Sequence, residues 1–169
     1  ALNGHAIGAS VTSATLCNGI IAADGATLST PFSALGLCPE GCSSIQFAHL
    51  MGEQNAQRML GKEGWKPTAT EAKDVGLIEW VSSAETLIDE AKKIARTWID
   101  RGETRAYRGS KLEDLKATNA RESIALADAF LSSPFLKAQF KFLWRKKKYG
   151  PASMFGAMMI TRPIWSFML

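Results

Sequence analysis

The chain has 169 residues, of which 46% are hydrophobic and 21% are charged, a balance typical of one globular domain with a real core. This composition excludes an intrinsically disordered protein, and no apolar run reaches the roughly 18 residues that a transmembrane helix needs. The net charge of +4 is unevenly distributed, because residues 1–50 contain two acids and no Lys or Arg. All 20 basic residues therefore lie in residues 51–169.

The first part of the chain predicts short helices and strands in alternation. Asp24 and Gly25 form a turn signal between two of the strands, and Ser43 or Ser44 can cap the helix that follows the loop at 36–41. The expected elements are a buried small-residue helix at 8–18, strands at 19–23 and 26–30, helices at 43–51 and 53–60, a short helix between Thr68 and Gly76, and a strand at 77–81.

The second part predicts helices throughout. From Ala84 to Ile99 apolar residues recur on one face of a helix and charged residues on the other. Further helices are expected at 111–116, 120–131 and 134–148, the last with Pro134 in its first turn.

Three cysteines, Cys17, Cys38 and Cys42, match no standard zinc spacing, and no His lies close to them in sequence. We expect reduced thiols. A redox pair of Cys38 and Cys42 is the alternative.

Glu40 is an isolated acid in the loop at 35–44, and Asp24 is the only other acid in the stretch without Lys or Arg. A carboxylate among apolar, Gly and Ser residues, with no cation near it in sequence, is suited to taking up and returning a proton. The alternative is that Glu40 lies in a surface turn or stabilises the start of the next helix. Composition alone favours this structural alternative.

Four segments in a fixed order resemble the crotonase (enoyl-CoA hydratase/isomerase) superfamily. They are NGHAIGAS at 3–10, TPFSALG at 30–36, PEGCSS at 39–44 and ATEAKDVGLI at 69–78. The third segment is most similar to the peroxisomal-type Δ3,Δ2-enoyl-CoA isomerases. The resemblance covers residue 1 to about residue 148, and four motifs in order are far more specific than any one of them.

The resemblance implies an α/β protein with the crotonase fold. Residues 1–82 would form the C-terminal part of the spiral core of ββα units, 83–148 a helical trimerisation region, and 149–169 an apolar C-terminal extension. The N-terminal half of the fold would be missing from this chain. Phe167-Met168-Leu169 does not match the Ser-Lys-Leu peroxisomal address, so the expected peroxisomal location follows from the family alone, with the mitochondrion or cytoplasm as alternatives.

The resemblance also assigns chemical roles. The backbone N–H of Ala9, next to Gly8, would donate one hydrogen bond to the enolate oxygen of an acyl-CoA thioester, and the second donor lies in a segment absent from this chain. Glu40 is at the position of the isomerase base. The two glutamates that hydratases use correspond to Thr12 and Phe32, neither of which is a carboxylate. This pattern favours a 1,3-proton shift by one glutamate over water addition.

Binding residues follow from the same resemblance. An acyl chain would contact Phe32, Leu35 and Leu37, although core packing explains each of them equally well. The phosphates of coenzyme A, which is part of the substrate, would contact Lys141, Arg145 and Lys146. No metal or separate cofactor is expected.

The basic segment at 137–148 has six cations, no acids and interleaved aromatic residues. Such a helix also fits nucleic acid, an anionic membrane or a solvated helix end, but proximity to the phosphates of coenzyme A is the simpler explanation. His5 and His49 are expected to be structural.

The sequence therefore predicts a Δ3,Δ2-enoyl-CoA isomerase that binds fatty acyl-CoA and assembles as a homotrimer or hexamer, without nucleic acid or a transmembrane segment. A hydratase-like enzyme of the same superfamily and a noncatalytic subunit with this fold are the alternatives.

Overall fold

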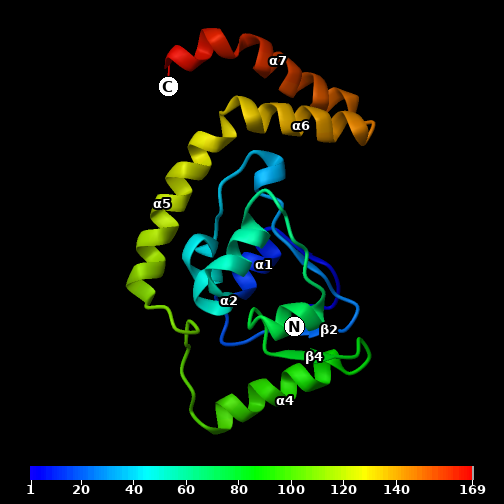
Figure 1. Cartoon of the computed structure of the whole chain (residues 1–169), viewed down its shortest axis with the longest axis vertical. Coiled ribbons are helices and arrows are strands. Elements are labelled where there is room, and N and C mark those ends of the chain that lie inside the picture. The colour runs from blue at the N-terminus through cyan, green and yellow to red at the C-terminus, as the bar shows by residue number, and fades with distance from the viewer. Residues whose placement is uncertain (169) are drawn as a thin grey trace.

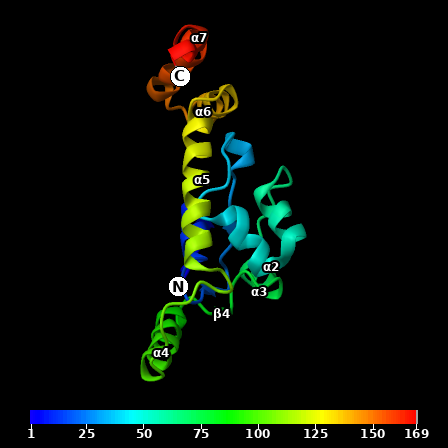
Figure 2. The ribbon, with the colours of Figure 1, turned by 90° about the vertical axis from the view of Figure 1, so that its left-hand side faces the viewer.

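The computed structural model describes residues 1–168, and Figure 1 shows an elongated arrangement of their elements. The strands and the first helices form a central body. Helix α4 (Leu87–Asp100) lies at one end of this body, and helices α6 (Ser133–Arg145) and α7 (Tyr149–Trp165) lie at the other. Helix α5 (Leu112–Phe130) runs along the side of the body between these two ends, as the turned view in Figure 2 also shows.

The strands are short and pair in parallel. Strand β1 (Ala6–Ile7) pairs with β3 (Leu28–Ser29), and β2 (Ile21–Ala23) pairs with β4 (Trp80–Ser82). The two predicted strands around the Asp24-Gly25 turn are therefore present, but each pairs with a different partner. The last strand begins at Trp80, later than the predicted start at Leu77, because Leu77 follows the left-handed Gly76 that ends the turn after α3 (Ala69–Asp74).

Helix α1 differs from the prediction, whereas the helices at 43–60 agree with it. Helix α1 covers only Ala9–Ala14, and its exposed residues show that the expectation of a helix buried on every side is wrong. Val11, Thr12 and the following Thr15 are buried, and Ala14 packs partly buried against the core. The two helices expected at 43–51 and 53–60 are confirmed as the two parts of α2 (Ser43–Leu60), which are separated by the non-helical Gly52 with its left-handed φ of 78°.

Among the C-terminal helices, α5 is longer than predicted, whereas α6 ends at Arg145, before the expected end at about 148. The segment at 117–119 contains no Gly or Pro, so the two helices expected at 111–116 and 120–131 are one continuous α5. Helix α7 and the 3-10 turn η2 (Ser166–Met168) occupy the extension at 149–169, of which Leu169 lies outside the described residues. Helix α7 packs on α6 through Phe135 and Phe155, whose rings meet edge to face. No helix within residues 1–168 is both long and apolar enough to cross a bilayer.

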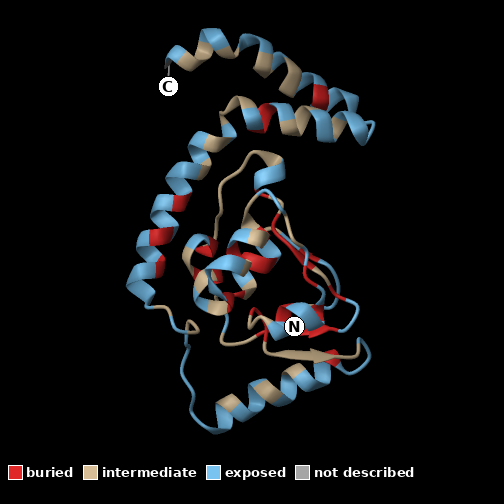
Figure 3. Cartoon of the chain, in the orientation of Figure 1, coloured by how far each residue is buried: buried red, intermediate tan, exposed pale blue. Residues whose placement is uncertain are grey.

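The core lies between the strands and helices α1 to α3, where Figure 3 shows most of the buried residues. Phe47 and Met59 of α2 pack there against Leu28 and Leu77. The core is thus held by contacts between residues far apart in sequence. It fixes the position of α1 and α2, from whose N-terminal ends the candidate site is built.

Candidate active site

The candidate site forms where the N-terminal ends of α1 and α2 meet. Gly8 has a φ of 60° and turns the chain from β1 into α1. The N–H of Ala9, the first helical residue, finds no acceptor among the described hydrogen bonds, whereas the N–H of Gly8 donates to the Ser29 carbonyl at 2.8 Å. This leaves a backbone donor free at the start of α1, as expected for the first turn of a helix.

Glu40 lies half-buried directly before α2, and Thr12 of α1 holds its carboxylate. The Thr12 hydroxyl donates to Glu40 Oε1 over 2.9 Å and also lies 3.4 Å from the Ala9 carbonyl oxygen. Thr12 is 1% exposed, so the contact is shielded from water on the side of the threonine. The hydroxyl thereby brings the Glu40 carboxylate next to the first turn of α1, although the two residues are 28 positions apart.

The turn after Glu40 is unusually constrained. Gly41 and Cys42 both adopt left-handed backbone angles, with φ of 63° and 66°. A Cβ on Gly41 would lie 2.7 Å from Thr12 Oγ1, so only glycine fits against the threonine there. Ser43, the first residue of α2, has a fully buried hydroxyl without a hydrogen-bond partner in the described structure.

Sequence reasoning did not identify Glu122 of α5. Its carboxylate accepts hydrogen bonds from the N–H of Cys42 at 2.6 Å and of Ser44 at 3.0 Å, and only 7% of the residue is exposed. The sequence feature that could have identified Glu122 is its position on the same helical face as Leu115 and Thr118, because an acid is unusual on the buried face of a helix.

The cysteines near the site are free thiols, as predicted. Burial raises the pKa of the Cys38 and Cys42 thiols, and the nearby carboxylates of Glu122 and Glu40 add to the increase. Cys42 Sγ also donates to the Leu115 carbonyl at 3.2 Å. Raised pKa values disfavour the reactive thiolate at neutral pH.

A hollow of about 760 Å³ lies between α6 and the 3-10 helix η1 (Ser33–Leu35). It contains three cationic side chains, Lys66, Lys141 and Arg145. Its remaining lining is mainly apolar and comes from Ile7, Pro31, Ala34, Leu35, Ala138, Gln139 and Phe142. Ile7 directly precedes the Gly8-Ala9 turn, so the hollow opens beside the start of α1.

The structure brings only some of the predicted binding residues to this hollow. Leu35 lines it, whereas Phe32 is 5% exposed and belongs to the core, and Leu37 is half-buried outside the lining. Lys141 and Arg145 line it as well. Lys146 is exposed at the end of α6 and is not part of the lining.

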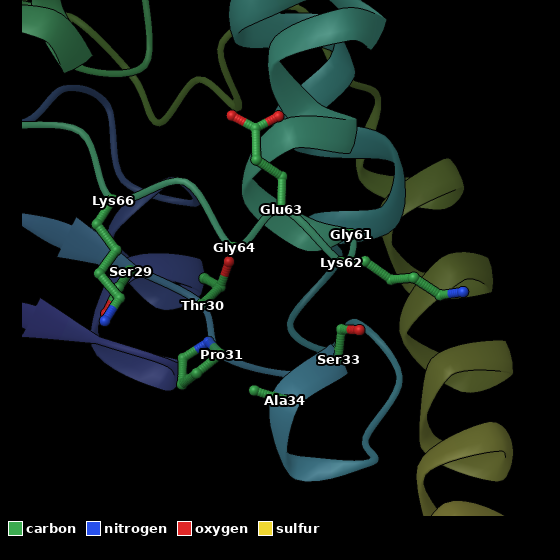
Figure 4. A pocket seen from close by; sticks show the side chains of 10 residues that line it. All are labelled: Ser29, Thr30, Pro31, Ser33, Ala34, Gly61, Lys62, Glu63, Gly64 and Lys66. Atoms are coloured by element: carbon green, nitrogen blue, oxygen red, sulfur yellow. The ribbon is translucent and has the colours of Figure 1, made fainter.

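A second, more polar hollow of about 310 Å³ also adjoins η1 and is shown in Figure 4. Ser29, Thr30 and Lys66 contribute its polar groups, while Lys62 and Glu63 extend away from Thr30 in different directions. It shares Pro31, Ala34 and Lys66 with the larger hollow. The two hollows therefore adjoin the same short segment that follows β3.

The two histidines are bound to hydroxyl groups away from this region. His5 Nδ1 lies 2.8 Å from Thr27 Oγ1, and His49 Nδ1 lies 2.8 Å from Ser110 Oγ.

A carboxylate hydrogen-bonded to a helix with a free N-terminal N–H, together with a mainly apolar hollow that contains cations and includes Ile7 just before that helix, has the parts of an acid-base enzyme for an anionic, partly apolar substrate. Residues 1–142 match the family Enoyl-CoA hydratase/isomerase. The chain belongs to this family and has the crotonase fold.

The relatives of the chain include enoyl-CoA isomerases. The chain is 37% identical to Enoyl-CoA delta isomerase 2 of Rattus norvegicus, and the match covers 87% of this chain and 39% of the rat protein. It is 34% identical to Enoyl-CoA delta isomerase 3, peroxisomal, of Mus musculus, over 87% of the chain and 48% of the relative. The chain thus spans less than half the length of these two relatives.

A solved structure has a closely similar fold. The enoyl-CoA hydratase/isomerase from Pseudoalteromonas atlantica T6c is 28% identical, with a TM-score of 0.73 over 86% of this chain and 60% of that one.

Proposed function

We propose that the protein is a Δ3,Δ2-enoyl-CoA isomerase in which Glu40 is the base. The hydrogen bond from Thr12 to Glu40 carries the proposal, because it joins the carboxylate to α1, the helix that begins with the free N–H of Ala9. The isomerase names of the rat and mouse relatives support the same reaction.

The reaction needs one carboxylate and an oxyanion donor. Glu40 removes a proton from the α-carbon of a 3-enoyl-CoA, and the electrons move onto the thioester oxygen to form an enolate. The N–H of Ala9 donates to this oxygen and stabilises the developing charge, with Gly8 allowing close approach. Glu40 then returns the proton to the γ-carbon, which leaves the double bond in the 2-trans position and regenerates the carboxylate.

The apolar hollow beside α6 is the proposed acyl-CoA site. Leu35 contributes to its apolar wall, and Lys141 and Arg145 provide positive charge for the phosphates of coenzyme A. Contacts of Phe32, Leu37 and Lys146 with the substrate stay predictions, since none of the three lines this hollow.

The test is conversion of a 3-enoyl-CoA to its 2-trans isomer by the intact protein and by Glu40→Gln. We expect the variant to lose at least about 100-fold in kcat, in keeping with removal of a general base. Asp24→Asn is the matched control, because Asp24 is the other acid in residues 1–50 and its carboxylate accepts a hydrogen bond from Gly25 N within its own turn. Equal rates for Glu40→Gln and the unmodified protein would contradict the proposal, and hydration faster than isomerisation would favour a hydratase.

A peroxisomal location is proposed from the name of the mouse relative. A homotrimer or hexamer is proposed from the family resemblance of the helical region. Co-purification with a peroxisomal marker during cell fractionation and native mass spectrometry test these two points. Co-purification with mitochondrial or cytosolic markers, or a monomeric mass, would contradict them.

A further inference from the structure

Helix α5 reaches into the candidate site through one buried acid. Glu122 lies in the middle of α5, 82 residues after Glu40, and its two carboxylate oxygens accept from the N–H groups of Cys42 and Ser44. The side chain of Cys42, the N-cap residue of α2, makes no hydrogen bond to the N–H groups at the start of the helix. Glu122 thus replaces a local cap and neutralises the positive end of the α2 dipole.

The turn that Glu122 holds is the one that carries Glu40. Gly41 and Cys42 are both left-handed, a conformation that a non-glycine residue such as Cys42 adopts only when its surroundings impose it. Cys42 donates two hydrogen bonds to α5. Its N–H donates to the Glu122 carboxylate, and its Sγ donates to the Leu115 carbonyl. Helix α5 therefore fixes the backbone two residues after the proposed base.

Glu122 is not itself placed to exchange protons with a substrate. Both of its oxygens are engaged by backbone N–H groups, and the residue is 7% exposed. No Lys or Arg of residues 1–168 forms an ion pair with it, so its partners are the free N–H groups at the start of α2.

We infer that Glu122 is a positioning residue that holds the turn at residues 40–44 so that the Glu40 carboxylate meets the Thr12 hydroxyl. This inference rests on the proposed function, since it gives Glu122 a role only through Glu40. It makes the alignment of the base depend on α5, a helix outside the strand-containing body. Loss of the contact leaves Glu40 present but misaligned, and small misplacements of a catalytic group are costly in rate.

The test compares Glu122→Gln and Glu122→Ala in the intact protein. The amide of Gln keeps one accepting oxygen and turns an NH₂ toward the other N–H, whereas Ala removes both acceptors. We expect kcat for 3-enoyl-CoA isomerisation to fall about 10-fold to 100-fold in Glu122→Gln and further in Glu122→Ala, with KM changed by less than about threefold. Amide hydrogen exchange at Cys42 and Ser44 is expected to accelerate in both variants.

Two controls separate positioning from general effects. Asp128→Asn removes an exposed acid from the same helix and is expected to leave kcat unchanged. Leu87→Ala truncates a fully buried residue that packs with Ile21 and Ala23, away from the site, and reports the effect of lost stability alone.

The outcomes are distinguishable. A kcat within twofold of the unmodified protein in Glu122→Gln, with Glu40→Gln inactive, overturns the positioning role and leaves the proposed function standing. An equal loss of kcat in Leu87→Ala, or unchanged exchange at Cys42 and Ser44, also overturns it. Absence of isomerase activity in the unmodified protein overturns the proposed function and this role together.

Discussion

The hydroxyl of Thr12 donates a hydrogen bond to the carboxylate of Glu40 at 2.9 Å and so joins the first turn of α1 to the loop before α2. By family resemblance, Thr12 occupies a position where hydratases have a glutamate. In this chain the same position supplies a neutral donor, which can orient a neighbouring carboxylate but cannot act as a second base. In the proposed mechanism the site therefore contains one base, Glu40, and a residue that orients it, Thr12.

Thr12→Val is expected to lower kcat about 10-fold to 100-fold. The substitution keeps the shape of a side chain that is 1% exposed but removes a hydrogen bond to a charged group, which is worth about 1.5–3 kcal/mol. Steady-state kinetics with a 3-enoyl-CoA measures the effect. Thr15→Val is the control, because Thr15 is equally buried and its hydroxyl donates only to the Thr12 carbonyl. A kcat for Thr12→Val that matches that of Thr15→Val would exclude an orienting role for the Thr12 hydroxyl.

Gly41→Ala is expected to lower the free energy of unfolding by about 3 kcal/mol, from its left-handed φ together with the overlap at Thr12 Oγ1. Urea denaturation measures this change. Gly64→Ala is the control: its φ is also positive, but no atom lies within 4 Å of the added Cβ, so the cost is only about 1 kcal/mol. Equal destabilisation by the two variants would show that the contact with Thr12 does not matter.

Ser43→Ala is expected to leave the free energy of unfolding unchanged or to raise it by about 1 kcal/mol. The Ser43 hydroxyl is buried without a partner, and burying an unpaired hydroxyl costs about 1–3 kcal/mol. Calorimetry or urea denaturation checks the sign. A loss of more than about 1 kcal/mol would mean that the hydroxyl makes a stabilising hydrogen bond.

Short motifs made the candidate base and the Gly8-Ala9 turn predictable, because each motif is contiguous in the sequence. The partners of these residues were not predictable in the same way. Thr12 was recognised only as lacking a carboxylate, and its contact with Glu40 depends on how the core places α1 against α2. Glu122 was missed entirely, since 78 residues separate it from Ser44, the nearer in sequence of its two partners.

The fold was likewise predictable where it depends on residues close in sequence, and unpredictable where it depends on residues far apart. Amphipathic periodicity located α4, and the Thr68-Glu71 capping box that predicted α3 is present, with hydrogen bonds in both directions. The parallel pairing of β2 with β4 connects residues 59 positions apart, as in Ile21 and Trp80, and no local pattern encodes it. The continuity of α5 agrees with a local feature, since the segment at 117–119 contains no Gly or Pro.

Lys141→Gln and Arg145→Gln are each expected to raise KM for an acyl-CoA about threefold to tenfold at low salt, with little change in kcat. Both side chains line the hollow beside α6, and a charge that contacts the phosphates binds substrate and transition state alike. The effect should shrink at high salt and with an acyl-pantetheine thioester, which lacks the nucleotide phosphates. Lys137→Gln is the control, since exposed Lys137 does not line the hollow. An increase in KM that is the same for acyl-pantetheine would refute contact with the phosphates.

Glu79 and Arg108 form a partly buried ion pair whose acid should give the stability of the protein a specific pH dependence. Burial raises the pKa of Glu79, although the N–H of Ile20, which donates to Oε2 at 2.6 Å, and the Arg108 guanidinium both oppose the increase. The folded protein therefore binds the Glu79 proton more tightly than the unfolded chain does.

At pH values between the ordinary pKa of Glu and the raised pKa of Glu79, the folded state binds more protons than the unfolded state. The contribution of Glu79 to the free energy of unfolding is therefore largest below the ordinary pKa. It falls as pH rises through the raised pKa. Glu79→Gln should abolish this fall, and urea denaturation at a series of values between about pH 4 and pH 7 measures it. Glu90→Gln, which changes an exposed acid of α4, is the control and should keep the fall. If the curve of Glu79→Gln instead runs parallel to that of the unmodified protein, another group is responsible for the pH dependence in this window.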